Sequence, residues 1–178
     1  MLILGISGSL RSESTNSHLI SAAADCVPPD SQFVIATHLA ELLHFNPDLD
    51  PEEIVSVRQW VDQVRIADGI VISTPEYARG YPGALKNALD WLVQTDAHID
   101  KPFMLLNASS RGVIAQATLT TVLETMSGIH FKAATITIPL LGKAISRSDI
   151  LANEEYSGKI KDALKHFVNA VKKPRECA

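Results

Sequence analysis

The sequence predicts an α/β fold in which helices cover both faces of one parallel, doubly wound, five-stranded sheet. Two observations lead to this prediction. Short apolar runs rich in β-branched residues alternate five times with segments of helical spacing, as expected for successive right-handed βαβ units. No shift in composition and no internal repeat interrupts the 178 residues, so we expect a single domain over residues 1–178.

The first part of the chain supplies three predicted strands and two predicted helices. In chain order these are a strand over 2–6, a helix over 19–27, a strand over 33–36, a helix over 54–64 and a strand over 67–73. Pro28 and Pro29 stop the first helix, because proline cannot continue one. The polar connection over 38–51 contains residues that favour turns.

The second part completes the pattern. In chain order it supplies a helix over 82–93, a strand over 103–106, a helix over 113–126, a strand over 134–138 and a helix over 154–172. Pro82 suits the first turn of its helix, where no N–H is missed. That helix has apolar residues at 84, 85, 88, 89, 91 and 92. This band is wider than one sheet-facing stripe needs, and it predicts a subunit interface.

Composition and charge exclude several classes of protein. Hydrophobic residues make up 46% and charged residues 20%, and the net charge is −4 with scattered basic residues, so we expect no nucleic-acid partner. Cys26 and Cys177 show neither disulfide nor metal spacing, and we expect no bound metal. The apolar run at the N-terminus stops at Ile6, too short for a signal peptide, and no stretch is long enough to span a membrane. We therefore expect a cytoplasmic protein.

The loop after the first predicted strand, over 7–17, is dense in hydroxyl groups and leads into a helix. A helix N-terminus offers unpaired N–H groups and the positive end of a dipole, which suit a phosphate. Ser9, Ser14 and Asn16 can add side-chain donors, and Arg11 adds a charge. The loop lacks the spacing of an NTP-binding P-loop, of a dinucleotide fingerprint and of a nucleophile elbow. The alternative for this loop alone is an ordinary serine-capped helix.

The loop after the third predicted strand contains Pro75, Gly80, Pro82 and Gly83 together with two tyrosines. In a sheet of flavodoxin strand order, the first and third strands flank the point where the chain reverses direction across the sheet. Ligands bind there, outside the carboxyl ends of the strands. The sequence therefore predicts a cleft between these two loops.

The two loops carry a family resemblance. The motif Gly-Ser-Leu-Arg-x-x-Ser-x-Asn from Gly8, and Thr-Pro-Glu-Tyr from Thr74 with the following Pro-Gly-x-Leu-Lys-Asn-Ala-x-Asp-Trp, resemble the NADPH-dependent FMN reductase family. That family is flavodoxin-like and includes quinone, chromate and azo reductases. The resemblance implies FMN as cofactor, NADPH or NADH as electron donor, and a homodimer or homotetramer.

The same resemblance assigns the binding residues. It implies that the FMN phosphate is surrounded by Ser9, Arg11, Ser14 and Asn16. It also implies that the isoalloxazine ring is bordered by Pro75, Glu76 and Tyr77, with Gly80 keeping the loop close to the ring. Because the redox chemistry belongs to the flavin, no catalytic acid, base or nucleophile is expected from the protein.

The sequence departs from the family pattern after the fourth predicted strand. Members commonly have a glycine-rich segment beside the ring, whereas residues 107–112 contain only Gly112. Ser109 and Arg111 either replace the missing contacts or cap the following helix. An arginine near the pyrimidine edge of the ring would stabilise the negative charge of reduced flavin.

The expected function is transfer of electrons from NAD(P)H through FMN to a small acceptor such as a quinone, free flavin, chromate or azo compound. The alternative is a flavodoxin-like electron carrier or regulatory binding module without turnover. Carrier flavodoxins are typically more acidic and use a threonine-rich phosphate loop, and this chain has neither feature.

Overall fold

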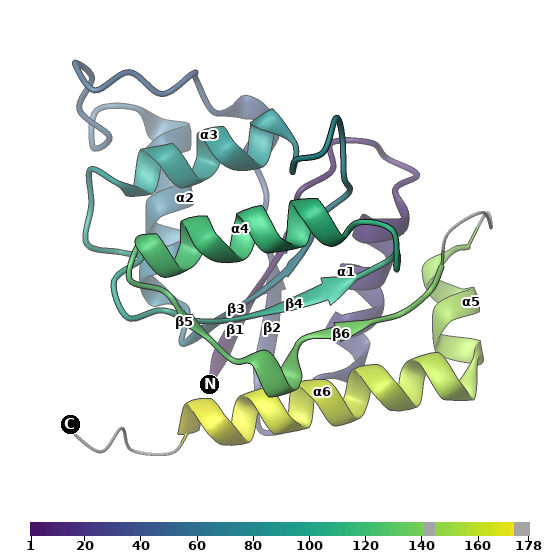
Figure 1. Ribbon diagram of the computed structural model, residues 1–178. Helices are drawn as coiled ribbons and strands as arrows, with labels where there is room; N and C mark the ends of the chain where they lie inside the picture. The colour runs from purple at the N-terminus through teal and green to yellow at the C-terminus, as the bar shows by residue number, and fades with distance from the viewer. Residues whose placement is uncertain (141–144, 173–178) are drawn as a thin grey trace.

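The computed structural model describes residues 1–140 and 145–172. Its parallel sheet has the strand order β2-β1-β3-β4-β5, with a further short strand, β6, also paired to β4 (Figure 1). The strands are β1 (Leu2–Ser7), β2 (Gln32–Ile35), β3 (Gly69–Ser73), β4 (Pro102–Asn107), β5 (Ile129–His130) and β6 (Ile136–Thr137). This order is the flavodoxin order, and it confirms the predicted fold class.

The last position in the sheet is shared by two short strands. β5 pairs with the beginning of β4 and β6 with its end, and the 3₁₀ turn η2 (Lys132–Ala134) lies between them. The single strand predicted over 134–138 was therefore wrong in its extent. At the interruption, the backbone N–H of Leu105 donates to the hydroxyl of Thr135 at 3.1 Å. A side chain thus replaces the missing strand partner.

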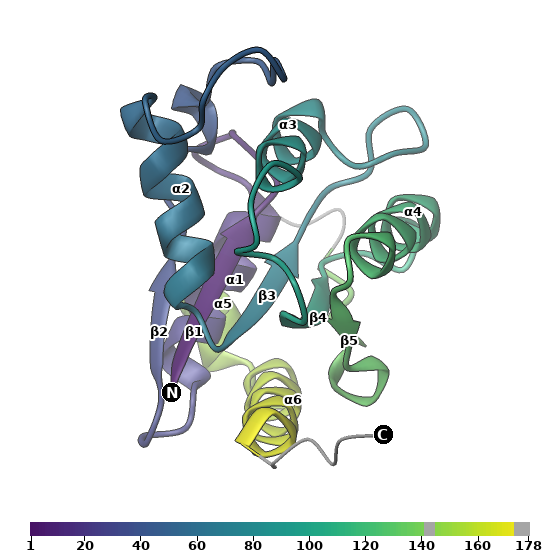
Figure 2. The same cartoon turned by 90° about the vertical axis from the view of Figure 1, so that its left-hand side faces the viewer.

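Six helices form two layers. They are α1 (Thr15–Cys26), α2 (Val55–Ile66), α3 (Gly83–Leu92), α4 (Val113–Thr125), α5 (Arg147–Ala152) and α6 (Glu154–Lys172). Figure 2 shows α2, α3 and α4 on one face of the sheet and α6 on the other. The core is divided accordingly. Leu4 and Ile6 of β1 pack toward α2 and α3, whereas Ile3 packs toward α1 and α6, as the alternation of side chains along a strand requires.

The short helix α5 was not predicted, because it shows no long apolar period. Its start is fixed by a capping box between Ser146 and Asp149. Arg147 also forms a two-pronged ion pair with Asp25 of α1, with N···O distances of 2.6 and 2.5 Å. Local capping and one tertiary contact thus define a helix that hydrophobic spacing could not reveal.

The wide apolar band of α3 is covered within the chain itself. Trp91 is fully buried, its indole N–H donates to the carbonyl of Leu43 at 2.8 Å, and its ring meets Phe45 edge-on at 5.3 Å. The amide of Asn87 also bonds to the backbone of both residues. The connection between β2 and α2 therefore occupies the surface that the sequence analysis assigned to a partner subunit. The band is not evidence for an oligomer.

Two partly buried histidines make stability depend on pH. His130 stacks on Phe103 with 4.7 Å between ring centroids. Burial lowers the pKa of both His98 and His130, although Glu124 opposes this shift at His130. Neither Nδ1 atom makes a hydrogen bond within the described residues. Protonation would therefore place a charge at a partly desolvated position, which at His130 lies 3.7 Å from a carboxylate oxygen of Glu124.

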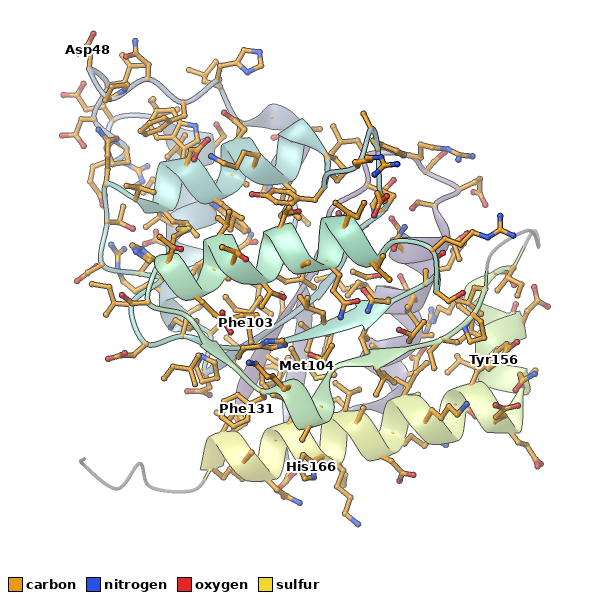
Figure 3. The ribbon with its side chains drawn as sticks, in the orientation of Figure 1. Asp48, Phe103, Met104, Phe131, Tyr156 and His166 are labelled. Carbon is orange, nitrogen blue, oxygen red and sulfur yellow. The ribbon has the colours of Figure 1, made fainter. Side chains whose placement is uncertain are left out.

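We expect the free energy of unfolding to fall as the pH drops below about 6.5, the pKa of an unfolded histidine. Below that value the unfolded chain binds more protons than the folded chain, so acid favours unfolding. Urea unfolding at about pH 7.5 and about pH 5.5 measures the effect. His130→Gln should weaken the pH dependence, whereas the same change at exposed His166 of α6 should not (Figure 3). Equal slopes for all three proteins would contradict this account.

Candidate functional site

Three loops meet at the carboxyl edge of the sheet, after β1, β3 and β4, at the upper right of Figure 1. The ends of β1 and β3 are in register through Ser7 and Ser73, and the N–H of Gly8 donates to the carbonyl of Ser73 at 2.8 Å. A Cβ atom added at Gly8 would lie only 2.3 Å from the hydroxyl oxygen of Thr74. Glycine at this position therefore allows the first two loops to touch.

The three loops border an open cavity of about 380 Å³. Its wall consists of the first turn of α1, residues 74–76 and residues 107–112. Among the predicted site residues, the wall includes Asn16, Pro75, Glu76, Ser109 and Arg111. The structure thus brings residues from all three loops together at the edge of the sheet where a ligand was predicted.

The first loop has the features of a phosphate-binding site. Ser9, Ser14 and Asn16 are polar but buried. Ser14 is the N-cap residue of α1, yet its side chain makes no capping hydrogen bond within the described residues. Ser73 donates a 2.9 Å hydrogen bond to Oδ1 of Asn16, which orients the amide of Asn16. Among the residues that the structure describes, no side chain satisfies the N-terminal N–H groups of α1, which helix geometry leaves unpaired, so these groups suit an anion.

Arg11 lies at the exposed end of this loop. It borders a neighbouring hollow of about 440 Å³ between the loop and the start of α5. Among the residues that the structure describes, no carboxylate pairs with it. Arg11 is therefore not part of the wall of the cavity described above, and its contact with a phosphate stays a prediction.

The Glu76 side chain has a role that the sequence did not reveal. One carboxylate oxygen accepts hydrogen bonds from the N–H groups of Ile114 and Ala115, at 3.0 and 2.9 Å. These are the second and third residues of α4, whose own N-cap, Gly112, has no side chain to offer. Glu76 therefore caps α4 from another loop and ties the loop after β3 to the loop after β4.

Residues 77–80 form a tight hairpin beyond Glu76. Tyr77 and Gly80 exchange backbone hydrogen bonds of 2.8 and 3.0 Å. Ala78 and Arg79 between them have φ of 48° and 63°, and positive φ at both central residues characterises a type I′ turn. A Cβ atom at Gly80 would meet only one atom, at an ordinary 3.9 Å. The protein itself therefore does not require glycine there, and its expected contact with the ring stays a prediction.

The loop after β4 is organised by local bonds. The hydroxyl of Ser109 accepts the N–H of Arg111 at 2.9 Å, and the side chain of Asn107 contacts that of Gln116 at 2.5 Å. Neither Ser109 nor Arg111 caps α4, because Glu76 does so. The capping alternative for these two residues was therefore wrong, whereas both do line the cavity.

Thr15, Thr74 and Asn107 also line the cavity and were not among the predicted site residues. Thr74 and Asn107 lie at the ends of β3 and β4, so their position along the strands was the available signal. Within residues 1–140 and 145–172, no group of histidine, cysteine or carboxylate side chains could hold a metal ion. No helix in those ranges is both long and apolar enough to cross a membrane.

Comparisons with known proteins agree with this geometry. The sequence model of a family described as NADPH-dependent FMN reductase matches residues 1–140. A quinone reductase of Escherichia coli K12 is 34% identical over 121 residues, which cover 65% of this chain and 63% of that protein. An NAD(P)H-dependent FMN reductase of Pseudomonas aeruginosa is 36% identical over 111 residues, covering 61% and 60%. The chain thus matches less than two thirds of the length of each relative.

A solved flavoenzyme, an NAD(P)H:(acceptor) oxidoreductase from Paracoccus denitrificans, has the same fold. It superposes with a TM-score of 0.78 over 96% of this chain and 97% of its own, at 23% identity.

Proposed function

Because the chain belongs to the NADPH-dependent FMN reductase family, we propose that it is an FMN-dependent oxidoreductase. It takes electrons from NAD(P)H and delivers them to a small acceptor. The observation that supports this most is the uncapped N-terminus of α1. It is surrounded by buried Ser9, Ser14 and Asn16 and shares a cavity with the loops after β3 and β4.

The residues present fit FMN. A phosphate monoester needs several N–H or O–H donors and a positive charge, and we assign Ser9, Arg11, Ser14 and Asn16 to that task. When bound, FMN supplies the redox chemistry by accepting a hydride and releasing the electrons to an acceptor. The protein therefore has to bind and orient the cofactor and limit access of water.

The other two loops border the flat part of the cofactor. Pro75 and Glu76 form the wall on the β3 side, and Ser109 and Arg111 the wall on the β4 side; we assign Tyr77, which follows Glu76, to the ring as well. The carboxylate of Glu76 acts through α4, so its contribution is to hold these two walls together. The charge of Arg111 favours the anionic reduced state of a flavin beside it.

We propose a quinone as the acceptor, since a quinone is a flat molecule that can stack on an open flavin face. The name of the Escherichia coli relative supports this choice. We also propose the cytoplasm as the location, because NAD(P)H is available there.

Steady-state kinetics test the proposal against the alternative of an electron carrier. The purified, FMN-loaded protein should oxidise many equivalents of NADPH when a quinone is present. Reduction of a single equivalent, with no further NADPH consumed after quinone is added, would instead identify a carrier.

We further propose that the protein forms a homodimer through the outer face of α4. Val113, Ala117, Thr118 and Thr121 are exposed on this helix, and its only charged residue is Glu124. The hydroxyls of Thr118 and Thr121 bond to carbonyls one turn earlier, at 2.9 and 3.0 Å. The helix therefore presents mainly apolar atoms, which suit close packing against a second copy.

Thr121→Lys should convert this dimer to a monomer, because it would bury an unpaired charge between the two helices. Light scattering at micromolar concentration measures the mass. Val93→Lys, at an exposed residue just after α3, is the matched control and should remain dimeric. A wild-type protein that is monomeric with flavin bound, or a dimer that only Val93→Lys dissociates, would contradict this interface.

A further inference from the structure

We propose that Arg79 binds the 2′-phosphate of NADPH and makes the protein prefer NADPH to NADH. This inference rests on the proposed function and adds a specificity residue to it. It starts from the distribution of arginines. In the described part of the chain, Arg65 and Arg147 pair with carboxylates and Arg58 donates to a backbone carbonyl.

The described arginines that lack a carboxylate or carbonyl partner lie at the carboxyl edge of the sheet. Within residues 1–140 and 145–172, Arg11, Arg79 and Arg111 form no ion pair, and all three are exposed. They lie on the loops after β1, β3 and β4, which are neighbours in the sheet. In a chain of net charge −4, this concentrates unpaired positive charge at the carboxyl edge.

The acidic side chains on these loops do little to cancel that charge. Glu76 is engaged with the N-terminus of α4, and Glu13 lies 3.4 Å from His18. The N-termini of α1, α3 and α4 follow the same three loops and add their positive dipole ends. The edge is therefore suited to a ligand with more negative charge than the single phosphate of FMN.

Arg79 is held in a conformation that arginine rarely adopts. Its φ of 63° follows a φ of 48° at Ala78, in a turn that asparagine and glycine form with less strain. The turn is closed by the Tyr77–Gly80 bonds, and Glu76 fixes its base to α4. Strained residues held in this way are concentrated in ligand-binding segments. Arg79 is thus held in a short turn whose backbone is fixed at both ends.

We infer the ligand of Arg79 from the roles proposed for Arg11 and Arg111. Arg11 is assigned to the FMN phosphate and Arg111 to the ring, which leaves Arg79 for the second substrate. NADPH and NADH differ only in a 2′-phosphate, and a guanidinium binds a phosphate dianion through paired, charge-assisted hydrogen bonds. An arginine on a loop whose residues 74–76 line the cavity can therefore distinguish the two nucleotides by charge.

The test compares the two nucleotides in FMN-loaded variants. Arg79→Gln should lower kcat/KM for NADPH by about 10- to 100-fold. The value of kcat/KM for NADH should stay within about twofold of the wild type, because NADH has no 2′-phosphate and a lost charged contact would have a larger effect. Arg79→Lys should restore part of the loss. Arg58→Gln on α2 is the matched exposed control and should change neither value. Equal losses for both nucleotides, or no loss, would overturn the assignment.

A second variant and a binding measurement separate recognition from folding and turnover. Arg79→Gly keeps the turn, because glycine adopts positive φ without strain, but it removes the charge. Adenosine 2′-monophosphate should bind the wild-type protein more tightly than adenosine 5′-monophosphate in a calorimetric titration, and Arg79→Gly should abolish the difference. Unchanged nucleotide binding combined with weakened reduction of an anionic acceptor such as chromate would overturn the proposal. A wild-type protein that oxidises neither nucleotide would contradict the proposed function, and this titration would still decide the role of Arg79.

Discussion

Replacing Arg11 with alanine is expected to raise the dissociation constant for FMN by about 10- to 100-fold, because a charge-assisted hydrogen bond contributes about 1.5–3 kcal/mol. The dissociation constant for riboflavin, which has no phosphate, should not change. The reason is local: Arg11 has no carboxylate partner in the described residues, and it lies beside the uncapped N-terminus of α1. Flavin fluorescence titrations with both ligands measure the difference.

Two further variants sharpen this experiment. Arg11→Lys keeps the charge but loses the guanidinium geometry, so it should bind FMN with intermediate affinity. Arg58→Gln removes an arginine of α2 that lies outside the three loops, so it should bind FMN as the wild type does. Equal losses for FMN and riboflavin in Arg11→Ala would contradict the assignment of this loop to the phosphate.

The second large effect is expected at Glu76. Glu76→Ala should lower the free energy of unfolding by about 1–3 kcal/mol, since two N–H groups of α4 lose their charged acceptor. The hairpin over 77–80 also loses its anchor, so FMN affinity should fall as well. Glu76→Gln retains an oxygen acceptor without the charge and should show a smaller loss. Urea unfolding of the three proteins gives the stability difference.

Hydrogen exchange locates the effect of Glu76. The amides of Ile114 and Ala115 should exchange faster in Glu76→Ala, because the bonds of 3.0 and 2.9 Å are removed. Glu53→Ala, at an exposed glutamate before α2, is the control and should leave both amides unchanged. Unaltered exchange at Ile114 and Ala115 in Glu76→Ala would show that the cap does not form in solution.

The fold was largely predictable because its signals are local. The central strands are continuous apolar runs, as expected where a parallel sheet is covered on both faces, and alternation with amphipathic helices sets the order. The errors arose where distant residues decide the outcome. The hydroxyl of Thr135 completes the edge of β4, and Leu43 and Phe45 cover Trp91. The hydrophobic periodicity of β4 and of α3 does not predict either contact, because the partner residues lie in other segments.

The position of the site was predictable for a similar reason, whereas the tasks of individual side chains were not. Loops at the carboxyl ends of parallel strands must lie at one edge, so Asn16, Pro75 and Arg111 could be expected around one cavity. The bond from Glu76 to α4 spans 38 residues of sequence, and nothing at Gly112 indicates a missing cap. The turn at Ala78 and Arg79 lacks the asparagine or glycine that would have marked it.

The most direct test of the proposed function is anaerobic mixing of the FMN-loaded protein with one equivalent of NADPH, followed by a quinone. The account predicts that the absorbance of oxidised flavin is lost on addition of NADPH and recovers on addition of the quinone, with FMN still bound to the protein throughout. Flavin absorbance that NADPH leaves unchanged, in a protein shown to retain FMN, would contradict it.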